Sequence, residues 1–268
     1  MRRLPLSAFC LALSTVAMAQ LSSATDRPIA LKRDSQAEAL VARVLAANGP
    51  RISAETGTTT SGTIRLGEDP TRYPVKIYTM GNDHIRTEID RPEGTHTRIV
   101  NSGRASYTPG TGQNRNLNLL NTINERIEHI PSLSAIADDD TDHQQLEYLG
   151  ENDVGGARIQ KVAASWSDAV TPDEQQEFLN RTRIVYFIET ETNRIVQVEY
   201  DRCAEEDSNV IFHYRVVYSD YTESGGRSIP ATVTTYLNGA FLSELKIASY
   251  AENTGASPAT FTLPEVTR

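Results

Sequence analysis

From about residue 73 onward, apolar residues recur at every second position, and this period of two is the strongest constraint on the fold. Tyr73, Val75 and Ile77 alternate with more polar neighbours, and Ile85 and Ile89 alternate with charged ones. Successive side chains of a β-strand point to opposite faces of its sheet, so such strands bury one face and wet the other. Short turn sequences separate the strands, which suits antiparallel hairpins. The chain is therefore predicted to be mainly β.

The second half of the chain continues this pattern. The Asn238-Gly239 pair, flanked by apolar residues, is the strongest hairpin signal in the sequence. After this turn, Phe241, Leu245 and Ile247 are expected to face one way. Strands are predicted at about 157–166, 182–189, 194–201 and 209–219. In the last of these, one apolar face is expected to comprise Val210, Phe212, Tyr214, Val216 and Tyr218.

Two segments have helical periodicity instead. A helix is expected from about Ser35 to Ala47, capped by Asp34 or Ser35 and ended by Asn48-Gly49-Pro50. A mid-chain apolar stripe recurs at i, i+1, i+4 and i+8, which predicts a helical insert and makes it a candidate cover for the apolar face of the sheet. That stripe is Leu119, Leu120, Ile123 and Ile127. The acidic segment 168–180 is expected to be an exposed loop or a short helix. The expected fold is α+β, with about 11–12 strands.

The N-terminus has the features of a secretory signal peptide. Arg2 and Arg3 precede an apolar stretch that is too short to cross a bilayer, and Ala17-Met18-Ala19 fits a cleavage site. Cys10 raises the alternative of a lipoprotein, but the bulky Phe9 before it disfavours lipid modification. We therefore expect a signal peptide at 1–19, a flexible leader at 20–34 and a single domain at 35–268. This processing predicts a soluble periplasmic protein with no transmembrane segment.

The net charge of the chain limits the classes of binding partner that we expect. The whole chain carries a net charge of −9, and loss of Arg2 and Arg3 makes it −11. An acidic chain repels phosphate backbones, so nucleic acid is not an expected partner.

Cys203 is the one cysteine left after cleavage, so an intramolecular disulfide is not expected. The sequence assigns no further role to this thiol.

The sequence contains no strong motif for metal binding or catalysis. The run from Asp138 to His143 is rich in oxygen ligands, but it lacks the glycine and distal glutamate of a calcium loop. The five histidines are scattered without zinc-site spacing, although His84 and His96 are candidates for cross-strand neighbours. Neither Ser61-Gly62 nor Ser102-Gly103 has the flanking pattern of a hydrolase nucleophile. No catalytic residue, metal site or cofactor is therefore predicted, and an enzyme is the least favoured class.

The order of elements resembles a known superfamily. An N-terminal helix ends in Asn-Gly, a meander carries Ile85-Arg86-Thr87-Glu88, and a helical insert precedes a second meander. The chain then has Tyr236-Leu237-Asn238-Gly239 and closes with Phe261-Thr262-Leu263-Pro264. This layout is similar to that of the periplasmic lipoprotein-localisation factors and the outer-membrane lipoprotein-sorting proteins. The resemblance implies a curved antiparallel half-barrel with helices over its concave side, where acyl chains are held.

These observations predict a binding or carrier protein of the periplasm, which holds a lipid or lipoprotein acyl chain between sheet and helices. The alternative is an envelope interaction or sensor module that docks a protein partner and carries no ligand. The sequence leaves the ligand, any transfer partner and the oligomeric state undetermined. Eight residues are candidates for an apolar ligand-binding lining: Leu119, Leu120, Ile123, Ile127, Phe212, Tyr214, Phe241 and Leu245.

Overall fold

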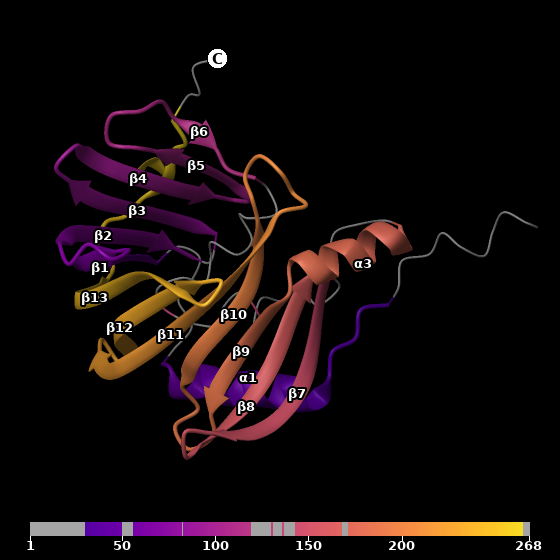
Figure 1. Cartoon of the computed structure of the whole chain (residues 1–268). Coiled ribbons are helices and arrows are strands. Elements are labelled where there is room, and N and C mark those ends of the chain that lie inside the picture. Colours follow the sequence, from indigo (N-terminus) through magenta and orange to yellow (C-terminus); the bar gives the residue numbers. More distant parts are fainter. Residues whose placement is uncertain are drawn as a thin grey trace, which may run out of the picture.

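The computed structural model consists of one large, curved antiparallel sheet (Figure 1). It describes residues 30–49, 56–81, 83–118, 130, 136, 143–167 and 171–264. The strands of the sheet are β1 (Gly57–Leu66), β2 (Arg72–Met80), β3 (His84–Arg91), β4 (Gly94–Asn101), β5 (Arg104–Thr108), β6 (Arg115–Asn116), β7 (Gln144–Val154), β8 (Ala157–Trp166), β9 (Ile184–Glu189), β10 (Ile195–Cys203), β11 (Ile211–Ser224), β12 (Arg227–Leu237) and β13 (Ala240–Glu252).

The strand order explains why the sheet is a half-barrel. It runs β6-β5-β4-β3-β2-β1-β13-β12-β11-β10-β9-β8-β7, and every pair is antiparallel. We call β1–β6 the first arm and β7–β13 the second arm. The arms meet where β1 pairs with β13, with Ile64 opposite Leu245. The outer strands β6 and β7 are not paired with each other, so the sheet stays open. The curved half-barrel expected from the sequence is confirmed, with 13 strands.

The N-terminal helix α1 (Ser35–Ala47) has the bounds predicted from the sequence. The Asp34 carboxylate caps it by accepting a 2.8 Å hydrogen bond from the Gln36 amide. Leu40 and Val44 are fully buried and pack into the main core against the second arm. Gly49 follows the helix with a φ of +97°, a conformation that glycine adopts without strain. The polar face of α1 stays in solvent, as its amphipathic sequence requires.

The last residues of the predicted leader pair with the edge of the sheet. Arg33 forms a parallel β-bridge with Leu146 at the edge of β7. The Asp34 amide donates to the Leu146 carbonyl, and the Leu146 amide donates to the Lys32 carbonyl, both at 3.0 Å. Residues 32–34 of the predicted leader thus satisfy hydrogen-bonding groups that the edge of β7 offers. The segment 1–19, predicted to be a signal peptide, lies outside the described residues.

The second arm follows the predicted meander closely. Turns at Gly225-Gly226 and Asn238-Gly239 connect β11 to β12 and β12 to β13. The acidic segment before β9 forms the helix α3 (Pro172–Arg181), so the short-helix alternative holds for 172–181. Val210 lies before the start of β11 and is 44 % exposed. It is therefore not part of the apolar face that the sequence predicts for this strand. No helix among the described residues is long and apolar enough to span a membrane.

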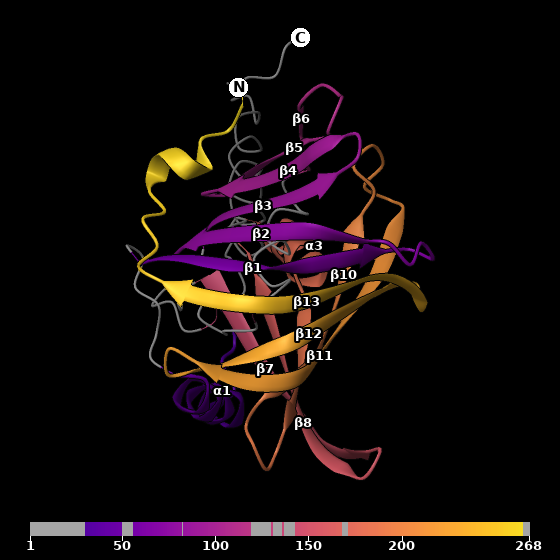
Figure 2. The same ribbon diagram turned by 90° about the vertical axis from the view of Figure 1, so that its left-hand side faces the viewer.

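Two separate apolar cores stabilise the sheet. The main core lies on the concave side and contains residues of α1 and of both arms, among them Ile77, Tyr186 and Val216. The second core is smaller and lies on the convex side of the first arm, where Phe261 packs on Met80 and Ile99. Phe261 belongs to the short 3-10 helix η3 (Pro258–Phe261), and Figure 2 shows this C-terminal segment running from β13 past β1–β4.

Candidate functional site

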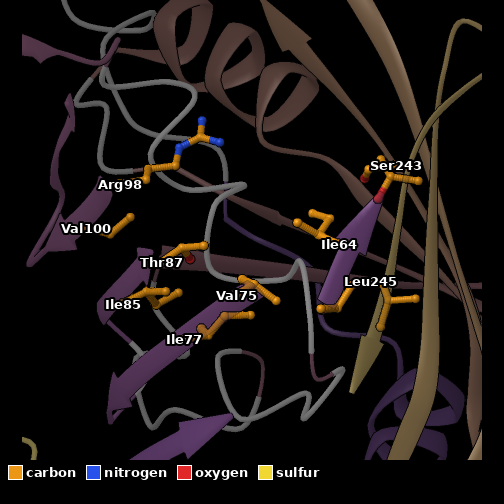
Figure 3. Close-up of a pocket in the computed structure, with 11 residues that line it drawn as sticks. Ile64, Val75, Ile77, Ile85, Thr87, Arg98, Val100, Ser243 and Leu245 are labelled. Carbon is orange, nitrogen blue, oxygen red and sulfur yellow. The ribbon is translucent and has the colours of Figure 1, made fainter. Parts of the chain in front are cut away.

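A cavity of about 110 Å³ lies against the concave face, where the first arm meets β12 and β13. Figure 3 shows the side chains that line it, with Arg98 at one end and Leu245 and Ser243 at the other. The lining residues are Ile64, Val75, Ile77, Ile85, Thr87, Arg98, Val100, Val233, Thr235, Ser243 and Leu245. They come from β1, β2, β3, β4, β12 and β13, so the cavity spans the junction between the two arms.

Strand alternation and register place these side chains on one face. Leu245 of β13 is opposite Ile64 on one side and opposite Val233 on the other. Directly opposed residues of an antiparallel pair point to the same face, and so do residues two apart in one strand. Val75 and Ile77 on β2 therefore point to the same side as Ile85 and Thr87 on β3. The cavity wall follows directly from the period-two pattern of the sequence.

The chemistry of the lining is that of a binding surface. Of the eleven described side chains in the lining, seven are aliphatic and three carry hydroxyl groups, and the remaining one is the charged Arg98. An apolar cavity of about 150 Å³ accepts a benzene-sized molecule, so about 110 Å³ accommodates a few carbon atoms. None of the described lining residues is a carboxylate, histidine or cysteine that could act as a general base or nucleophile. This arrangement can bury apolar groups of a ligand.

Beside the cavity, the concave face of the first arm is basic. Arg91, His96, Arg98 and Arg115 all point to this face, and we call them the basic wall. Their orientation follows from register, because His96 is opposite Ile89, Arg98 is opposite Thr87, and Arg115 is opposite Tyr107. The two carboxylates carried by strands β1–β6 are Glu88 and Asp90 on β3, and alternation places both on the convex face.

One carboxylate from a turn compensates part of the basic wall. The Glu93 Oε1 atom lies 3.0 Å from His96 Nε2 and accepts a 3.3 Å hydrogen bond from Arg91. The pKa of Glu93 is lowered by a hydrogen bond to its own backbone amide and by the adjacent His96 and Arg91. His96 Nδ1 is 2.6 Å from the Tyr107 hydroxyl, and the Arg115 guanidinium lies 5.1 Å from the centre of the Tyr107 ring. Glu93 thus interacts with Arg91 and His96 of the basic wall.

Three of the predicted lining residues lie on the concave face, and one of them lines the cavity. Leu245 lines the cavity and is 6 % exposed. Tyr214 stacks on Tyr200, with ring centres 5.4 Å apart and planes 2° from parallel, and it packs against the main core. Phe212 is opposite Arg202 on the same face and is half-buried. Tyr214 and Phe212 lie on the second arm and are not part of the cavity lining.

Phe241 points to the opposite face from Leu245, so the expectation that they share a face is wrong. The register between β12 and β13 shifts, since Ser243 is opposite Thr235 whereas Phe241 is opposite Tyr236. This bulge inserts one extra residue and reverses the alternation. Phe241 packs edge-to-face on Tyr236, with ring centres 6.4 Å apart, and the Arg65 guanidinium lies 4.3 Å from the Phe241 ring centre. These contacts place Phe241 on the convex side.

The apolar stripe of the mid-chain insert lies outside the described residues, so its role remains a prediction. It comprises Leu119, Leu120, Ile123 and Ile127. Ile136 of the same insert is described, is fully buried and belongs to the main core. Ahead of the insert, Leu117 packs against the main core, and the Asn118 amide donates a hydrogen bond to the Glu205 carboxylate. Leu117 and Ile136, on either side of the apolar stripe, therefore both pack in the main core.

Most of the cavity lining was not selected from the sequence. Val75, Ile77 and Ile85 belong to alternating segments that were recognised as strands, so their burial was predictable. Their grouping with Val233 and Leu245 was not, because it requires β1 to pair with β13 across the length of the chain. Arg98 was not predicted to line the cavity either, because an arginine between Thr97 and Ile99 has the usual pattern of a solvent-exposed strand residue.

His84 and His96 lie on opposite faces of the sheet. His84 is opposite Asn101 and stacks on Phe261 on the convex side, with ring centres 5.4 Å apart, whereas His96 lies on the concave side. The suggestion that these two are cross-strand neighbours is therefore wrong. Among the described residues, no group of three or more His, Cys, Asp or Glu side chains is arranged to hold a metal ion.

Comparison with known proteins identifies the fold. No protein-family model and no curated protein sequence matches the chain. The structure resembles a domain from Vibrio parahaemolyticus described as an outer membrane lipoprotein-sorting protein, with a TM-score of 0.53, 9 % identity and coverage of 84 % of this chain and 96 % of that one. A LolA superfamily protein from Nitrosomonas europaea gives a TM-score of 0.52, 11 % identity and coverage of 84 % and 97 %.

A third solved structure has the same architecture. It is a DUF1329 family protein from Desulfovibrio piger, with a TM-score of 0.53, 13 % identity and coverage of 85 % of this chain and 96 % of that one. Each likeness spans nearly the whole of the other chain. At such low identities the likeness establishes a shared fold, and a fold hosts many functions. The fold that the resemblance implied, a curved antiparallel half-barrel, is thus confirmed.

Proposed function

We propose that this protein is a periplasmic binding or carrier protein, which holds an apolar chain against the concave face of its sheet. The observation that carries the proposal is the aliphatic cavity between Ile64, Val233 and Leu245, at the junction of the two arms. An aliphatic surface held open in water gains about 25 cal/mol per Å² when a ligand covers it. Proteins with this fold include domains described as lipoprotein-sorting proteins, which supports a lipid-like ligand.

The size of the cavity limits what part of a ligand it holds. Ligand pockets for drug-sized molecules are about 300–1,000 Å³, whereas this cavity is about 110 Å³. A long acyl chain would therefore place one segment of its length in the cavity and the rest along the concave face. Each methylene group buried this way contributes about 0.8 kcal/mol. Binding of this kind needs no catalytic group, which agrees with the chemistry of the lining.

The test is binding of a neutral single-chain probe, n-dodecanol, measured by calorimetry and by native mass spectrometry. A variant with Val233→Phe would fill the cavity, because Val233 lines it and is 3 % exposed. The matched control is Thr234→Phe, which adds the same ring at the next position of β12, on the opposite face. We expect the wild type and the control to bind n-dodecanol, and the Val233→Phe variant to bind it at least tenfold more weakly.

Two results would decide against the proposal. One is a wild-type protein that binds no n-dodecanol, which would favour the interaction or sensor module instead. The other is an equal affinity of the Val233→Phe variant and the wild type, with both variants shown to be folded by their near-ultraviolet circular dichroism. That result would mean that the probe binds away from this cavity.

A further inference from the structure

We infer that the apolar ligand carries an uncharged oxygen group, a hydroxyl or an ester carbonyl, which binds to Thr235 and Ser243. The inference rests on the proposed function and adds the chemical class of the ligand. Thr235 of β12 and Ser243 of β13 both line the cavity and are directly opposed in the sheet. Figure 3 shows Ser243 at the same end of the cavity as Leu245, away from Arg98.

The two hydroxyl groups lie in a row of side chains that is otherwise aliphatic. Val216 of β11 is opposite Thr235, and Val198 of β10 is opposite Val216. On the other side, Leu66 of β1 is opposite Ser243. Directly opposed residues of an antiparallel pair point to the same face, so all five side chains belong to the concave face. Thr235 and Ser243 thus form a small polar spot between apolar neighbours that cannot form side-chain hydrogen bonds.

Ligand binding changes the surroundings of these two hydroxyl groups. Both residues are partly exposed, so water reaches them in the unliganded protein. An aliphatic chain that covers them displaces this water, and a polar group that loses its hydrogen-bond partners is costly. A hydrogen bond between the two hydroxyl groups satisfies only part of their capacity, because one donor and three lone pairs remain. An oxygen atom of the ligand at this position supplies the missing partner.

The same surroundings favour an uncharged group over an ion. The described lining residues that β1, β12 and β13 contribute are aliphatic or carry a hydroxyl group, so they offer no counter-charge to an ion. A hydroxyl group both donates and accepts hydrogen bonds, which suits an alcohol, and two hydroxyl groups can both donate to an ester carbonyl. The Cβ atoms of directly opposed residues are about 4.5–5.5 Å apart, so both hydroxyl groups can reach one oxygen atom.

The experiment uses three probes that have the same alkyl chain: 1-octanol, methyl octanoate and 1-chlorooctane. The chlorine atom adds bulk at the end of the chain but is a poor hydrogen-bond acceptor. Headspace gas chromatography measures the free concentration of each volatile probe over the protein solution and so gives its dissociation constant. Each probe is compared between protein variants, so that differences in solubility among the probes cancel.

A double variant assigns the preference to the hydroxyl pair. Thr235→Val with Ser243→Ala removes both hydroxyl groups and nearly preserves the size of the side chains. We expect it to bind at least one of the two oxygen-containing probes about tenfold more weakly than the wild type, as the loss of one or two hydrogen bonds would give. Its affinity for 1-chlorooctane should stay within about twofold of the wild-type value. The probe that loses more affinity identifies the preferred oxygen group.

The matched control is Thr234→Val. It makes the same chemical change at the next position of β12, where the side chain points to the convex face. We expect this control to bind all three probes as the wild type does. Near-ultraviolet circular dichroism checks that each variant is folded.

Thr87 provides a second check, because it is the third hydroxyl-bearing residue of the described lining and is opposite Arg98. Thr87→Val should weaken binding of the oxygen-containing probes less than the double variant does. A larger loss with Thr87→Val would place the oxygen group at the Arg98 end of the cavity and would overturn the inference.

The remaining outcomes separate this inference from the proposed function. If the double variant binds all three probes with wild-type affinity, the inference about the oxygen group is wrong and the apolar-binding function stands. If it loses affinity for all three probes by the same factor, the hydroxyl pair supports the cavity structurally, which also overturns the inference. If the wild type binds none of the probes, the proposed function itself fails.

Discussion

The Arg227 guanidinium and the Glu252 carboxylate form an ion pair that ties β12 to the end of β13. Arg227 is nearly enclosed, with 7 % of its side chain exposed, whereas Glu252 is 26 % exposed. The Tyr250 hydroxyl donates a 3.1 Å hydrogen bond to the same carboxylate. Gly49, at the end of α1, lies so close that a Cβ atom there would be 2.5 Å from the Gly226 carbonyl. The pair therefore lies where α1, β12 and β13 converge.

Replacing Arg227 by methionine should lower the free energy of unfolding by about 3 kcal/mol. Removing one partner of a buried pair leaves the other charge uncompensated, which typically costs about 3–5 kcal/mol, and the partial exposure of Glu252 places this case at the lower end. Urea denaturation measures the change. The double variant Arg227→Met, Glu252→Gln carries no unpaired charge and should recover part of the loss. A loss below about 1 kcal/mol in the single variant would show that the pair contributes little.

Replacing Phe261 by alanine should lower the free energy of unfolding by about 3–5 kcal/mol, because the ring is fully buried in the second core. The effect should be local, since this core is separate from the concave side. Hydrogen exchange followed by mass spectrometry should show faster exchange in β3 and β4, which contact η3, and little change in β8 or β9. Uniformly faster exchange across the whole sheet would contradict the description of two independent cores.

Leu245 and Phe241 give a paired test of which face binds ligand. Leu245→Ala removes a lining side chain that is 6 % exposed, so we expect a loss of about 2–5 kcal/mol in stability and a clear change in n-dodecanol affinity. Phe241→Ala removes a larger side chain from the convex side and should leave the affinity within twofold of the wild type. Calorimetry with both variants checks this, and a reversed pattern would place the ligand on the convex face.

Alkaline pH should destabilise the protein through three tyrosines. Burial raises the pKa of Tyr186, Tyr221 and Tyr250 above the ordinary value of 10.0. Below pH 10 these groups are protonated in both states and do not change the stability. Above pH 10 the unfolded chain loses these protons first, so the free energy of unfolding falls as the pH rises towards the raised pKa values. Urea denaturation at a series of alkaline pH values measures the decrease.

Tyrosinate absorbance provides an independent check on the same groups. The chain has 11 tyrosines, and the three named above should ionise last, only as the protein unfolds. Replacing Tyr186 by phenylalanine should make the alkaline decrease in stability smaller, because desolvation is the cause of its raised pKa. Ionisation of all 11 tyrosines near pH 10 in the folded protein would rule out this explanation.

Local signals predicted the local structure well. The bounds of α1 follow from Asp34 as a cap and Gly49 as a terminator, both of which act within a few residues of the helix ends. The last hairpin follows from Asn238 and Gly239, whose φ values of +49° and +83° are those that the turn between β12 and β13 requires. Each of these features depends on chemistry contained in a short stretch of chain, so one sequence was sufficient to identify it.

Longer-range features could not be predicted in the same way. The face of Phe241 was assigned wrongly because a bulge depends on the register between two strands, and register is a property of the pair. The packing of Phe261 on Met80 and Ile99 required knowledge of where the C-terminal segment returns. Arg98 carries no local sign of its position, since only the full strand order brings β12 and β13 next to the first arm.

The pairing of β1 with β13 has a consequence for how the chain folds. Every other neighbouring pair of strands in the sheet is consecutive along the sequence, so each arm can assemble as a series of local hairpins. The pair that joins them brings together residues such as Thr58 and Glu252, close to opposite ends of the chain. In a chain that emerges N-terminus first, the central seam can form only after the final strand is released. Until then the junction between the two arms, where Ile64 meets Leu245, is incomplete.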